Sequence, residues 1–455
     1  MLMALRFPPA RAAAGAMFLS ASLAGCGEQS APRLPAQVRV ADGNGQVARI
    51  GTLLPAPLVA TVMDADGQPA KGVRVEWATT GDDRLIPLDP ETDASGQSRA
   101  RWQLGGSEGE RTAQATLPGL EPAVFTAIAE GPDALPFDQP MALDFTTYDG
   151  SHQVVHPDYA ATPAEVFGRP FHLAITPYPF GDAGFENPSF FEGTRFDIWS
   201  LTPGTPNPIV LPDAGYLSDP DLVYVPERGE LWLYYRQVTT DNVVLLVRSA
   251  DGRAWSAPVE VARAPNHQLV SPSVVRRAEG DWWMFAVNAG TSGCGAAATV
   301  VEVRRSADGL HWGAPLPASL EQDGLWPWHI DVQWIPDRHT FWAVYNVKTE
   351  GSCTTPAVYL ASSGDGEAWD VVPQPVLVKG MIPGLEDIAY RTTFAYDPHT
   401  DALTFWFSGA RYEGGRYRWS AAVERRRRAS VFEALAAGVD PRLLPPAPAP
   451  LDDWP

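Results

Sequence analysis

The sequence predicts an all-β protein built from two domains. It contains 44 prolines and 40 glycines among 455 residues, a composition that favours short strands and tight turns over long helices. One turn motif recurs at a constant spacing in the second half of the chain, which indicates a repeated unit of several strands. We therefore predict a β-sandwich over residues 35–131, a linker over 132–143, and a five-bladed β-propeller over 144–435.

The net charge limits the partners that the protein can bind. The chain carries 54 acidic and 34 basic residues, a formal charge of −20. Because binding to nucleic-acid phosphates needs a basic face, this balance excludes a general nucleic-acid binder. Three cysteines are also too few for a small fold built on disulfides.

The N-terminal segment, 1–26, has the pattern of an export signal. Two arginines precede an apolar run over residues 12–24, which is too short for a permanent membrane-spanning helix. The run leads into Leu-Ala-Gly-Cys, and here the segment resembles a bacterial lipoprotein signal peptide. That resemblance implies that Cys26 is acylated, that the lipid is the only membrane contact, and that Gly27 directs the protein to the outer membrane. A secretory signal without lipid is the alternative. After this segment, we predict a linker over residues 27–34.

Residues 35–131 alternate apolar and polar side chains in short runs. Turns at 64–69 and 92–96 separate runs such as 59–62 and 72–77. Period-two alternation with Asp-Gly turns is typical of a β-sandwich. The patterns V-x-D-x-x-G-x-P-x-x-G-V-x-V-x-W and T-D-x-x-G resemble bacterial Ig-like domains of the invasin and intimin type. This resemblance implies a spacer without catalytic residues.

A repeat determines the prediction for the second domain. The motif S-x-D-G-x-x-W occurs three times, and its aspartates are equally spaced along the chain at Asp251, Asp308 and Asp365. Asp-Gly suits a tight turn between strands, because glycine tolerates positive φ and aspartate bonds the turn backbone. The motif resembles the Asp-box turns of sialidase-like propellers, although it is one residue shorter. We interpret it as structural and assign no catalysis to it.

Each turn motif follows a pair of strands, the first of which is aromatic. These aromatic strands occupy 231–235, 282–286, 341–345 and 403–407. Upstream of each lies the start of another strand, and five such starts recur at similar intervals at His156, Asp219, Ser271, His329 and Tyr390. Five four-stranded units predict a five-bladed propeller whose axis is lined by the first strand of each blade.

The starts of the five inner strands are unusually polar. Because alternate residues of a strand share one face, we expect an inner ring made of His156, Asp158, Asp219, Asp221, Ser271, Ser273, His329, Asp331, Tyr390 and Thr392. Loops that overhang the same end add Tyr178, Glu186, Asn187, Arg236, Lys348, Arg411, Tyr412 and Glu413. Aromatic rings and planar polar groups around a funnel are what a sugar requires, so the sequence predicts a carbohydrate site. His156, Asp158, Tyr178, Asn187, Arg236, Ser271, His329, Tyr390 and Arg391 are its predicted binding residues.

Glycoside hydrolysis needs two carboxyl groups, one protonated and one ionised. We predict Glu186 and Asp219 as this pair, with Asp331 or Asp158 orienting the substrate or raising a neighbouring pKa. Here the chain resembles the five-bladed glycosidases of family 43 and its relatives in families 32, 68 and 117. The Asp219-Pro220 pair matches their Asp-Pro strand start, whereas His156 stands where the family's catalytic base is expected. The resemblance therefore supports Asp219 alone.

Other interpretations of the same residues remain open. The aspartates and histidines of the ring are equally suited to binding neighbouring backbone, and Arg236 and Arg391 to pairing with the acids. No zinc-binding spacing of His and Cys occurs, so we assign no metal or cofactor; a structural calcium at the centre is the alternative. Cys294 and Cys353 occupy equivalent loops of adjacent blades, which predicts a disulfide between them in an oxidising compartment.

The sequence thus predicts an exported outer-membrane lipoprotein in which a spacer carries a propeller that hydrolyses a carbohydrate. A glycan-binding or adhesion protein without catalysis is the first alternative, and a sialidase-like enzyme is the second. The C-terminal segment, 436–455, forms a proline-rich tail.

Overall fold

The computed structural model describes residues 34–434 apart from 321, 323 and 353. The predicted signal, the 27–33 part of the linker, Cys26, Cys353 and the tail lie outside the described residues. The described chain is almost entirely β-structure, which confirms the all-β prediction. None of its helices is both long and apolar enough to cross a membrane. The short helices are α1 (Ala164–Phe167), η1 (Pro179–Gly181), η2 (Ala183–Phe185), η3 (Gly293–Gly295), η4 (Pro336–Arg338) and η5 (Ser430–Ala434).

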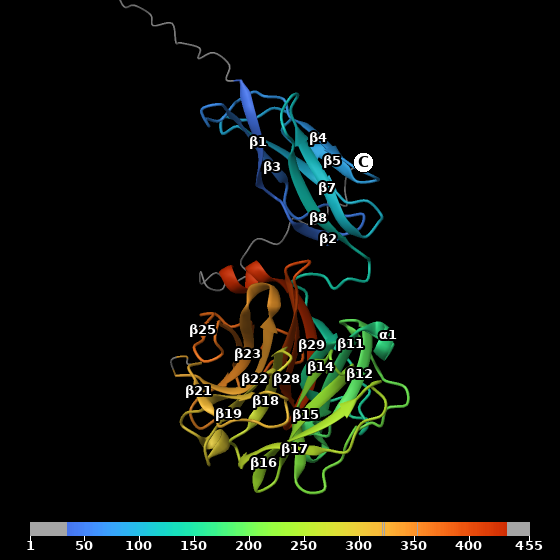
Figure 1. Cartoon of the computed structure of the whole chain (residues 1–455), viewed down its shortest axis with the longest axis vertical. Coiled ribbons are helices and arrows are strands. Elements are labelled where there is room, and N and C mark those ends of the chain that lie inside the picture. The colour runs from blue at the N-terminus through green and yellow to red at the C-terminus, as the bar shows by residue number, and fades with distance from the viewer. Residues whose placement is uncertain (1–33, 321, 323, 353, 435–455) are drawn as a thin grey trace, which may run out of the picture.

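The N-terminal part folds into two facing sheets, drawn in blue to cyan in Figure 1. Alternate residues of one strand, from Ala123 to Ala129, are buried, as expected when one face of a sheet packs on a core. Trp102 and Phe125 fill the space between the sheets. One sheet has the order β1 (Pro35–Asp42), β3 (Leu58–Asp64), β6 (Gln97–Gln103), β5 (Arg84–Pro87); the other has β2 (Gln46–Arg49), β8 (Ala123–Glu130), β7 (Gly109–Thr116), β4 (Glu76–Thr79).

The remainder of the described chain forms five antiparallel sheets in sequence order. The first sheet joins β10 (Val154–Ala161), β11 (Phe171–Pro177), β12 (Ser189–Arg195) and β13 (Ile198–Leu201). The second joins β14 (Tyr216–Val225), β15 (Glu230–Val238), β16 (Asp241–Ser249) and β17 (Val259–Pro265). The third joins β18 (Val270–Ala278), β19 (Asp281–Asn288), β20 (Val300–Ser306) and β21 (Leu316–Ala318). The fourth joins β22 (Trp326–Ile335), β23 (Thr340–Lys348), β24 (Ala357–Ser363), β25 (Asp370–Val371) and β26 (Leu377–Val378). The fifth joins β27 (Ile388–Asp397), β28 (Ala402–Glu413), β29 (Arg416–Arg427) and β9 (Met141–Leu143).

The five sheets surround a common axis. Their first strands contact one another in the closed order β10, β14, β18, β22, β27 and back to β10. The fifth sheet takes its outer strand, β9, from the segment that precedes the first sheet, so residues from both ends of this region close the ring. This arrangement is that of a β-propeller.

The repeated Asp-Gly motif forms turns at the outer strands, as the sequence predicts. In the first copy the Asp251 carboxylate accepts hydrogen bonds from the backbone N–H groups of Arg253 and Ala254. Gly366, in the third copy, has a φ of +74°, and a Cβ there would lie 2.6 Å from the Trp283 ring. Glycine is therefore required by both backbone conformation and packing.

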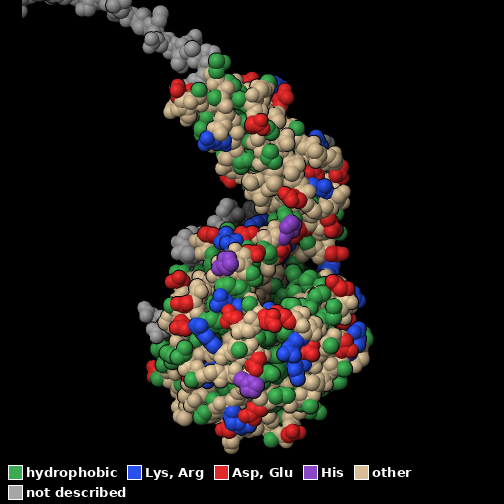
Figure 2. Space-filling view, viewed as in Figure 1, with side chains coloured by type: hydrophobic (Ala, Val, Ile, Leu, Met, Phe, Trp, Pro, Cys, Tyr) green, Lys and Arg blue, Asp and Glu red, His purple; other side chains and the backbone are tan. Residues whose placement is uncertain are grey.

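The sandwich meets the propeller at a narrow waist (Figure 1), through the ends of strands that point away from the inner-strand starts. Arg425, near the end of β29, is 5% exposed and makes two hydrogen bonds to the Glu130 carboxylate, at 2.6 and 2.7 Å. Arg195, at the end of β12, pairs with Asp133. Figure 2 shows acidic and basic side chains interspersed over this side of the molecule.

Candidate active site

The inner strands are bent where they reach the axis. The pairing of the first three inner strands with their neighbours shifts register at His156, Asp219 and Ser271. These three residues have φ values of +54°, +50° and +53°, which side chains other than glycine rarely adopt. A β-bulge re-aims the side chain that it carries. The bulges thus direct side chains from separate blades toward the same point, and strain of this kind concentrates at functional sites.

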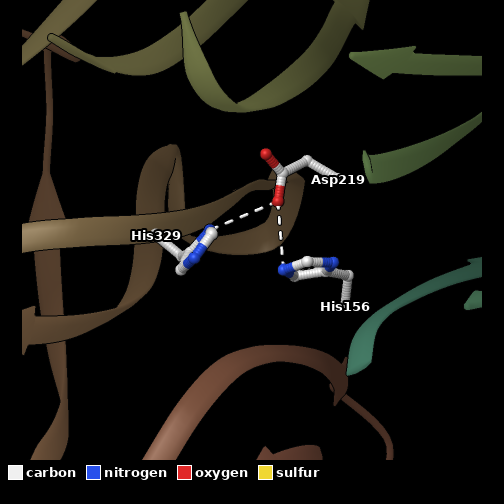
Figure 3. A group of neighbouring side chains, drawn as sticks. All are labelled: His156, Asp219 and His329. Atoms are coloured by element: carbon white, nitrogen blue, oxygen red, sulfur yellow. Dashed lines mark ion pairs between the residues drawn. The ribbon is translucent and has the colours of Figure 1, made fainter. Parts of the chain in front are cut away.

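His156, Asp219 and His329 meet at that point (Figure 3). The Asp219 Oδ1 atom lies 3.3 Å from Nε2 of His156 and 3.3 Å from Nδ1 of His329. All three side chains are at most 2% exposed. Apart from these contacts with one another, none of the three facing atoms has a partner among the described residues. Buried polar atoms are normally satisfied, so three potential ligand atoms that face one another in this way form a candidate site for a bound group.

The second carboxylate oxygen of Asp219 is held in place by the protein. Oδ2 lies 2.8 Å from the Arg236 guanidinium and accepts a hydrogen bond from the backbone N–H of Ser271. Although burial alone would raise the pKa of Asp219, Arg236 and the two imidazoles keep this pKa well below its usual range. Asp219 is therefore an anchored carboxylate with one oxygen presented to the axis.

Both histidines are in the form that binds metals. Burial lowers the pKa of His156 and of His329, which keeps the imidazoles neutral. Nδ1 of His156 lies 3.1 Å from the Thr176 hydroxyl, a contact that orients the ring and leaves Nε2 toward Asp219. Nδ1 of His329 faces Asp219 at 3.3 Å, and its Nε2 has no hydrogen-bond partner among the described residues.

Two histidines and one carboxylate are a suitable set for a divalent transition metal. The three ligand atoms can lie within 4.8 Å of one another. Catalytic zinc sites use three such protein ligands and keep a further position open, and the same set binds iron in other enzymes. The sequence analysis placed all three residues in the ring, but it assigned the two histidines to sugar binding and Asp219 to a catalytic pair with Glu186. The sequence signal that could have indicated a metal site was a histidine at the same strand position in two blades.

Glu186 lies beside this group. Its carboxylate accepts a hydrogen bond from Ser218 and is 3.5 Å from Nδ1 of His156. Burial raises the pKa of Glu186 to about 8. The neighbouring Asn187 is buried and donates a hydrogen bond to Tyr148. Glu186 is therefore an acid next to His156 that is able to hold or release a proton.

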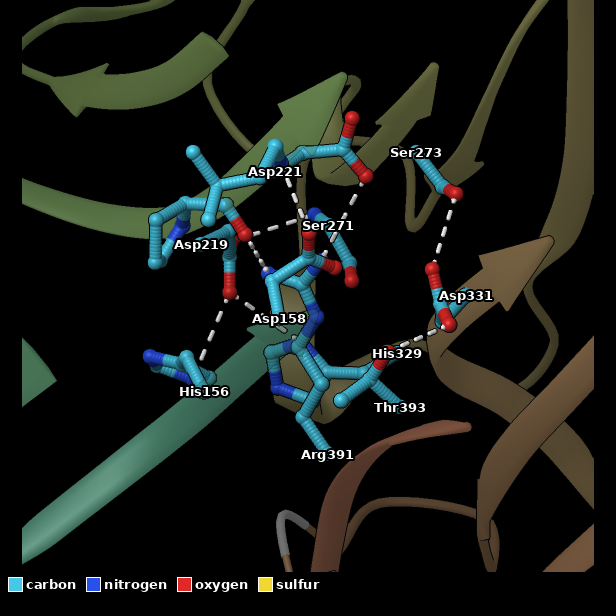
Figure 4. Close-up of polar contacts among 12 residues, drawn as sticks. His156, Asp158, Asp219, Asp221, Ser271, Ser273, His329, Asp331, Arg391 and Thr393 are labelled. Atoms are coloured by element: carbon cyan, nitrogen blue, oxygen red, sulfur yellow. Dashed lines mark hydrogen bonds and ion pairs between the residues drawn. The ribbon is translucent and has the colours of Figure 1, made fainter. Parts of the chain in front are cut away.

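Asp331, Asp158 and Arg391 belong to a second layer, shown in Figure 4. The Asp158 and Asp221 carboxylates accept hydrogen bonds from backbone N–H groups of the next blade, and Asp331 accepts them from Ser273 and Thr393. Arg391 lies 3.3 Å from Asp158 and so joins the last blade to the first. The three aspartates line the inner end of a cavity of about 800 Å³ at the opposite mouth of the axis. This layer ties the blades together.

An aromatic wall leads away from the two imidazoles. The Tyr390 ring is centred 4.6 Å from His329 and 5.4 Å from His156. Trp419 follows at 5.1 Å from Tyr390, and Tyr178 at 5.0 Å from Trp419. Tyr390 and Tyr178 were expected here. Trp419 was missed because it lies within β29, far along the chain from any inner-strand start.

The loops of the third and fourth blades are tied together beside the site. Lys348 is fully buried, and its ammonium group donates to the backbone carbonyls of Cys294 and Ala296. Cys294 forms a disulfide bond. Its expected partner Cys353 lies outside the described residues.

Comparison with known proteins identifies two informative similarities. No family model matches the chain. The A type blood N-acetyl-alpha-D-galactosamine deacetylase of Flavonifractor plautii is 27% identical over 321 residues, covering 58% of this chain and 42% of that protein. The chain thus spans less than half the length of this relative.

The second similarity concerns the fold. The crystal structure of an N-acetylgalactosamine deacetylase from F. plautii in complex with blood group B trisaccharide has a TM-score of 0.60 and 23% identity, covering 67% of this chain and 98% of that chain. The chain therefore shares the fold of that structure. An α-L-arabinanase of Penicillium chrysogenum complexed with arabinobiose matches at a TM-score of 0.43 and 14% identity, covering 63% and 98%.

Proposed function

We propose that this protein is a metal-dependent hydrolase that removes the acetyl group from an N-acetylated sugar of a glycan. The observation that carries the proposal is the convergence of three buried ligand atoms from His156, Asp219 and His329, whose only partners among the described residues are one another. The similarity to the F. plautii deacetylase supports the same reaction class. The reaction adds water across the amide bond and yields acetate and an amino sugar.

The residues of the chain divide the work of this reaction. A divalent metal held by the three donors would polarise the amide carbonyl and make bound water a stronger nucleophile. Arg236 and Thr176 hold Asp219 and His156 in the ligating orientation. Glu186 is suited to pass a proton to the departing amine. Tyr390 is half-buried beside the imidazoles and would offer an aromatic face to the sugar ring, while the buried Trp419 supports it from behind.

Paired-carboxylate glycoside hydrolysis is the second candidate. The raised pKa of Glu186 favours it, because a protonated acid is needed at the leaving oxygen. Its partner Asp219, however, is fully buried and engaged by Arg236, so it is poorly placed to attack a sugar or activate water for that reaction. The metal-dependent reaction uses Asp219 as it stands, and we therefore prefer it.

The setting of the site is also part of the proposal. We infer that the five sheets are the blades of a five-bladed propeller and that the sandwich is an Ig-like spacer behind a lipid on Cys26. The sandwich contacts the end of β29 that lies away from the site, and Asp133 of the linker contacts the corresponding end of β12. Ser189 and Arg195, the two ends of β12, are about 20 Å apart at strand rise. An anchored protein would thus present its site away from the outer membrane.

Acetate release tests the proposal directly. The full-length protein should release acetate from N-acetyl-α-galactosaminides, lose this activity on treatment with a chelator, and regain it with zinc, manganese or cobalt. His329→Ala should reduce the activity at least 100-fold, since one of three ligands is lost. Release of reducing sugar that persists in the chelator and disappears in Glu186→Gln would instead support glycoside hydrolysis. Glycan binding with neither product would support a lectin.

A further inference from the structure

The exposed aromatic side chains of the described chain are concentrated in one place. Three aromatics are exposed, namely Phe180 at 44%, Phe185 at 37% and Tyr412 at 59%. We call them the aromatic rim. Every other Phe, Tyr or Trp side chain in the part of the chain that the structure describes is buried or half-buried. Exposed apolar surface that gathers in one region marks an interaction site.

Two segments carry the rim, and both border the candidate active site. Phe180 and Phe185 lie in η1 and η2, immediately before Glu186. Tyr412 lies near the tip of the β28–β29 hairpin, opposite Tyr417. The Gln153 amide oxygen joins the segments, because it accepts hydrogen bonds from the backbone N–H groups of both Phe180 and Trp419.

The rim rings are held in fixed orientations. The Arg416 guanidinium lies 4.0 Å from the centre of the Phe180 ring, and Tyr412 packs edge-on against Tyr417 at 5.2 Å. Tyr148 packs beside Phe185 and donates a hydrogen bond to its carbonyl. Such rings lose little conformational entropy when a ligand stacks on them.

The chemistry of the rim matches a carbohydrate. Its two segments also carry planar charged groups, namely the Arg411–Glu413 ion pair beside Tyr412 and Asp182 between η1 and η2. Aromatic faces pack against sugar C–H groups while planar charged groups bond hydroxyls. The rim also continues inward to Tyr178, which contacts Trp419 and so reaches the imidazoles through Tyr390. One ligand can therefore span the rim and the centre.

We propose that the aromatic rim is an outer subsite that binds sugar units beyond the one that reacts, so that the substrate is an oligosaccharide or a glycan chain. This inference rests on the proposed function for its reacting end. It assigns the acetylated sugar to the centre and the following units to the Phe180, Phe185 and Tyr412 rings.

The test compares a short and a long substrate. The probes are methyl N-acetyl-α-galactosaminide and a trisaccharide that ends in the same sugar. In Phe180→Ala and in Tyr412→Ala, kcat/KM for the trisaccharide should fall by about 3- to 10-fold per lost ring, while the value for the monosaccharide stays constant. Leu211→Ala, which removes a 70% exposed leucine outside the rim, serves as the matched control and should change neither value.

A binding measurement separates this inference from the proposed reaction. If the protein releases no acetate, calorimetry of the full-length protein with the trisaccharide still tests the rim: affinity lost in the double variant Phe180→Ala/Tyr412→Ala supports a glycan subsite. Equal losses for both substrates would overturn the inference, because they would mean that the rim shapes the centre. Unchanged kcat/KM and affinity for the trisaccharide in the folded double variant would overturn it as well.

Discussion

The replacement of His329 by alanine should remove most of the stability that a bound divalent cation gives the protein. In the structure this imidazole contacts the Asp219 carboxylate at 3.3 Å and packs against Tyr390 at 4.6 Å. Its removal therefore has a cost that does not depend on metal, and unfolding in chelator measures that cost. The difference between unfolding with and without metal isolates the contribution of His329 to metal binding.

The magnitude follows from binding linkage. At a free metal concentration of about 1,000 times Kd, a ligand that binds only the folded state stabilises it by about 4.1 kcal/mol. Loss of an outer partner of a metal ligand weakens affinity by about 10- to 100-fold, so we expect at least about 100-fold for His329 itself. The same metal concentration is then about ten times Kd, and the stabilisation falls to about 1.4 kcal/mol. The expected difference is about 2.7 kcal/mol.

Urea unfolding of wild type and variant, each with chelator and with zinc, measures this difference. The chelator curves give the cost of the substitution itself, and the gain on adding zinc gives the linkage. His311→Ala is the control, because this histidine is largely exposed on an Asp-Gly turn. The reasoning is refuted if zinc, manganese and cobalt all leave the wild type unchanged, or if His329→Ala gains as much as the wild type.

Three other buried side chains should give measurable effects. Arg391→Met leaves the Asp158 carboxylate without its buried cation and should lower the free energy of unfolding by about 3–5 kcal/mol. Burial lowers the pKa of His172 to about 4, so folding excludes a proton that the unfolded chain binds below about pH 6.5. Its contribution to stability is complete above that pH and should fall by about 3 kcal/mol toward pH 4, a loss that His172→Gln removes. Arg425→Met breaks the pair with Glu130 and should speed proteolysis of the segment between the domains.

Each of these outcomes has a matched comparison. Arg263→Met removes an exposed arginine that pairs with Glu260, and it should leave the free energy of unfolding almost unchanged. An equally small effect of Arg391→Met contradicts the closing role of that residue. For His172, the expectation is contradicted if the urea midpoint falls by the same amount between pH 7 and pH 4 in the wild type and in His172→Gln. For Arg425, an unchanged cleavage rate would show that the waist is held by other contacts.

Much of the fold could be predicted from local patterns. The Asp251, Asp308 and Asp365 turns are specified by short-range chemistry, since serine, aspartate and glycine within one short motif satisfy the turn backbone. Aromatic and β-branched runs such as β15 and β19 form strands for the same local reason. The polar starts of the inner strands also point to the axis as the place where a site would form.

The roles of the ring residues could not be predicted in the same way. Asp331 and Asp219 both lie near the start of an inner strand. A small shift along the strand nevertheless places Asp331 in the layer that joins the blades and Asp219 beside the two imidazoles. That distinction depends on bulges at His156 and Asp219, whose positive φ values no local sequence pattern signals. Trp419 reaches the aromatic wall through the pairing of β29, which is a long-range property.

The sequence by itself determined the strands, their order and the kinds of side chain available near the axis, because turn chemistry and side-chain alternation act over a few residues. Only the tertiary structure decided which of those side chains share a ligand. His156 and His329 belong to the first and fourth of the five sheets, yet their ring centres lie 5.0 Å apart. Ring closure brings them together, and the depth of burial then leaves their facing nitrogens in contact with Asp219 and with no other described residue.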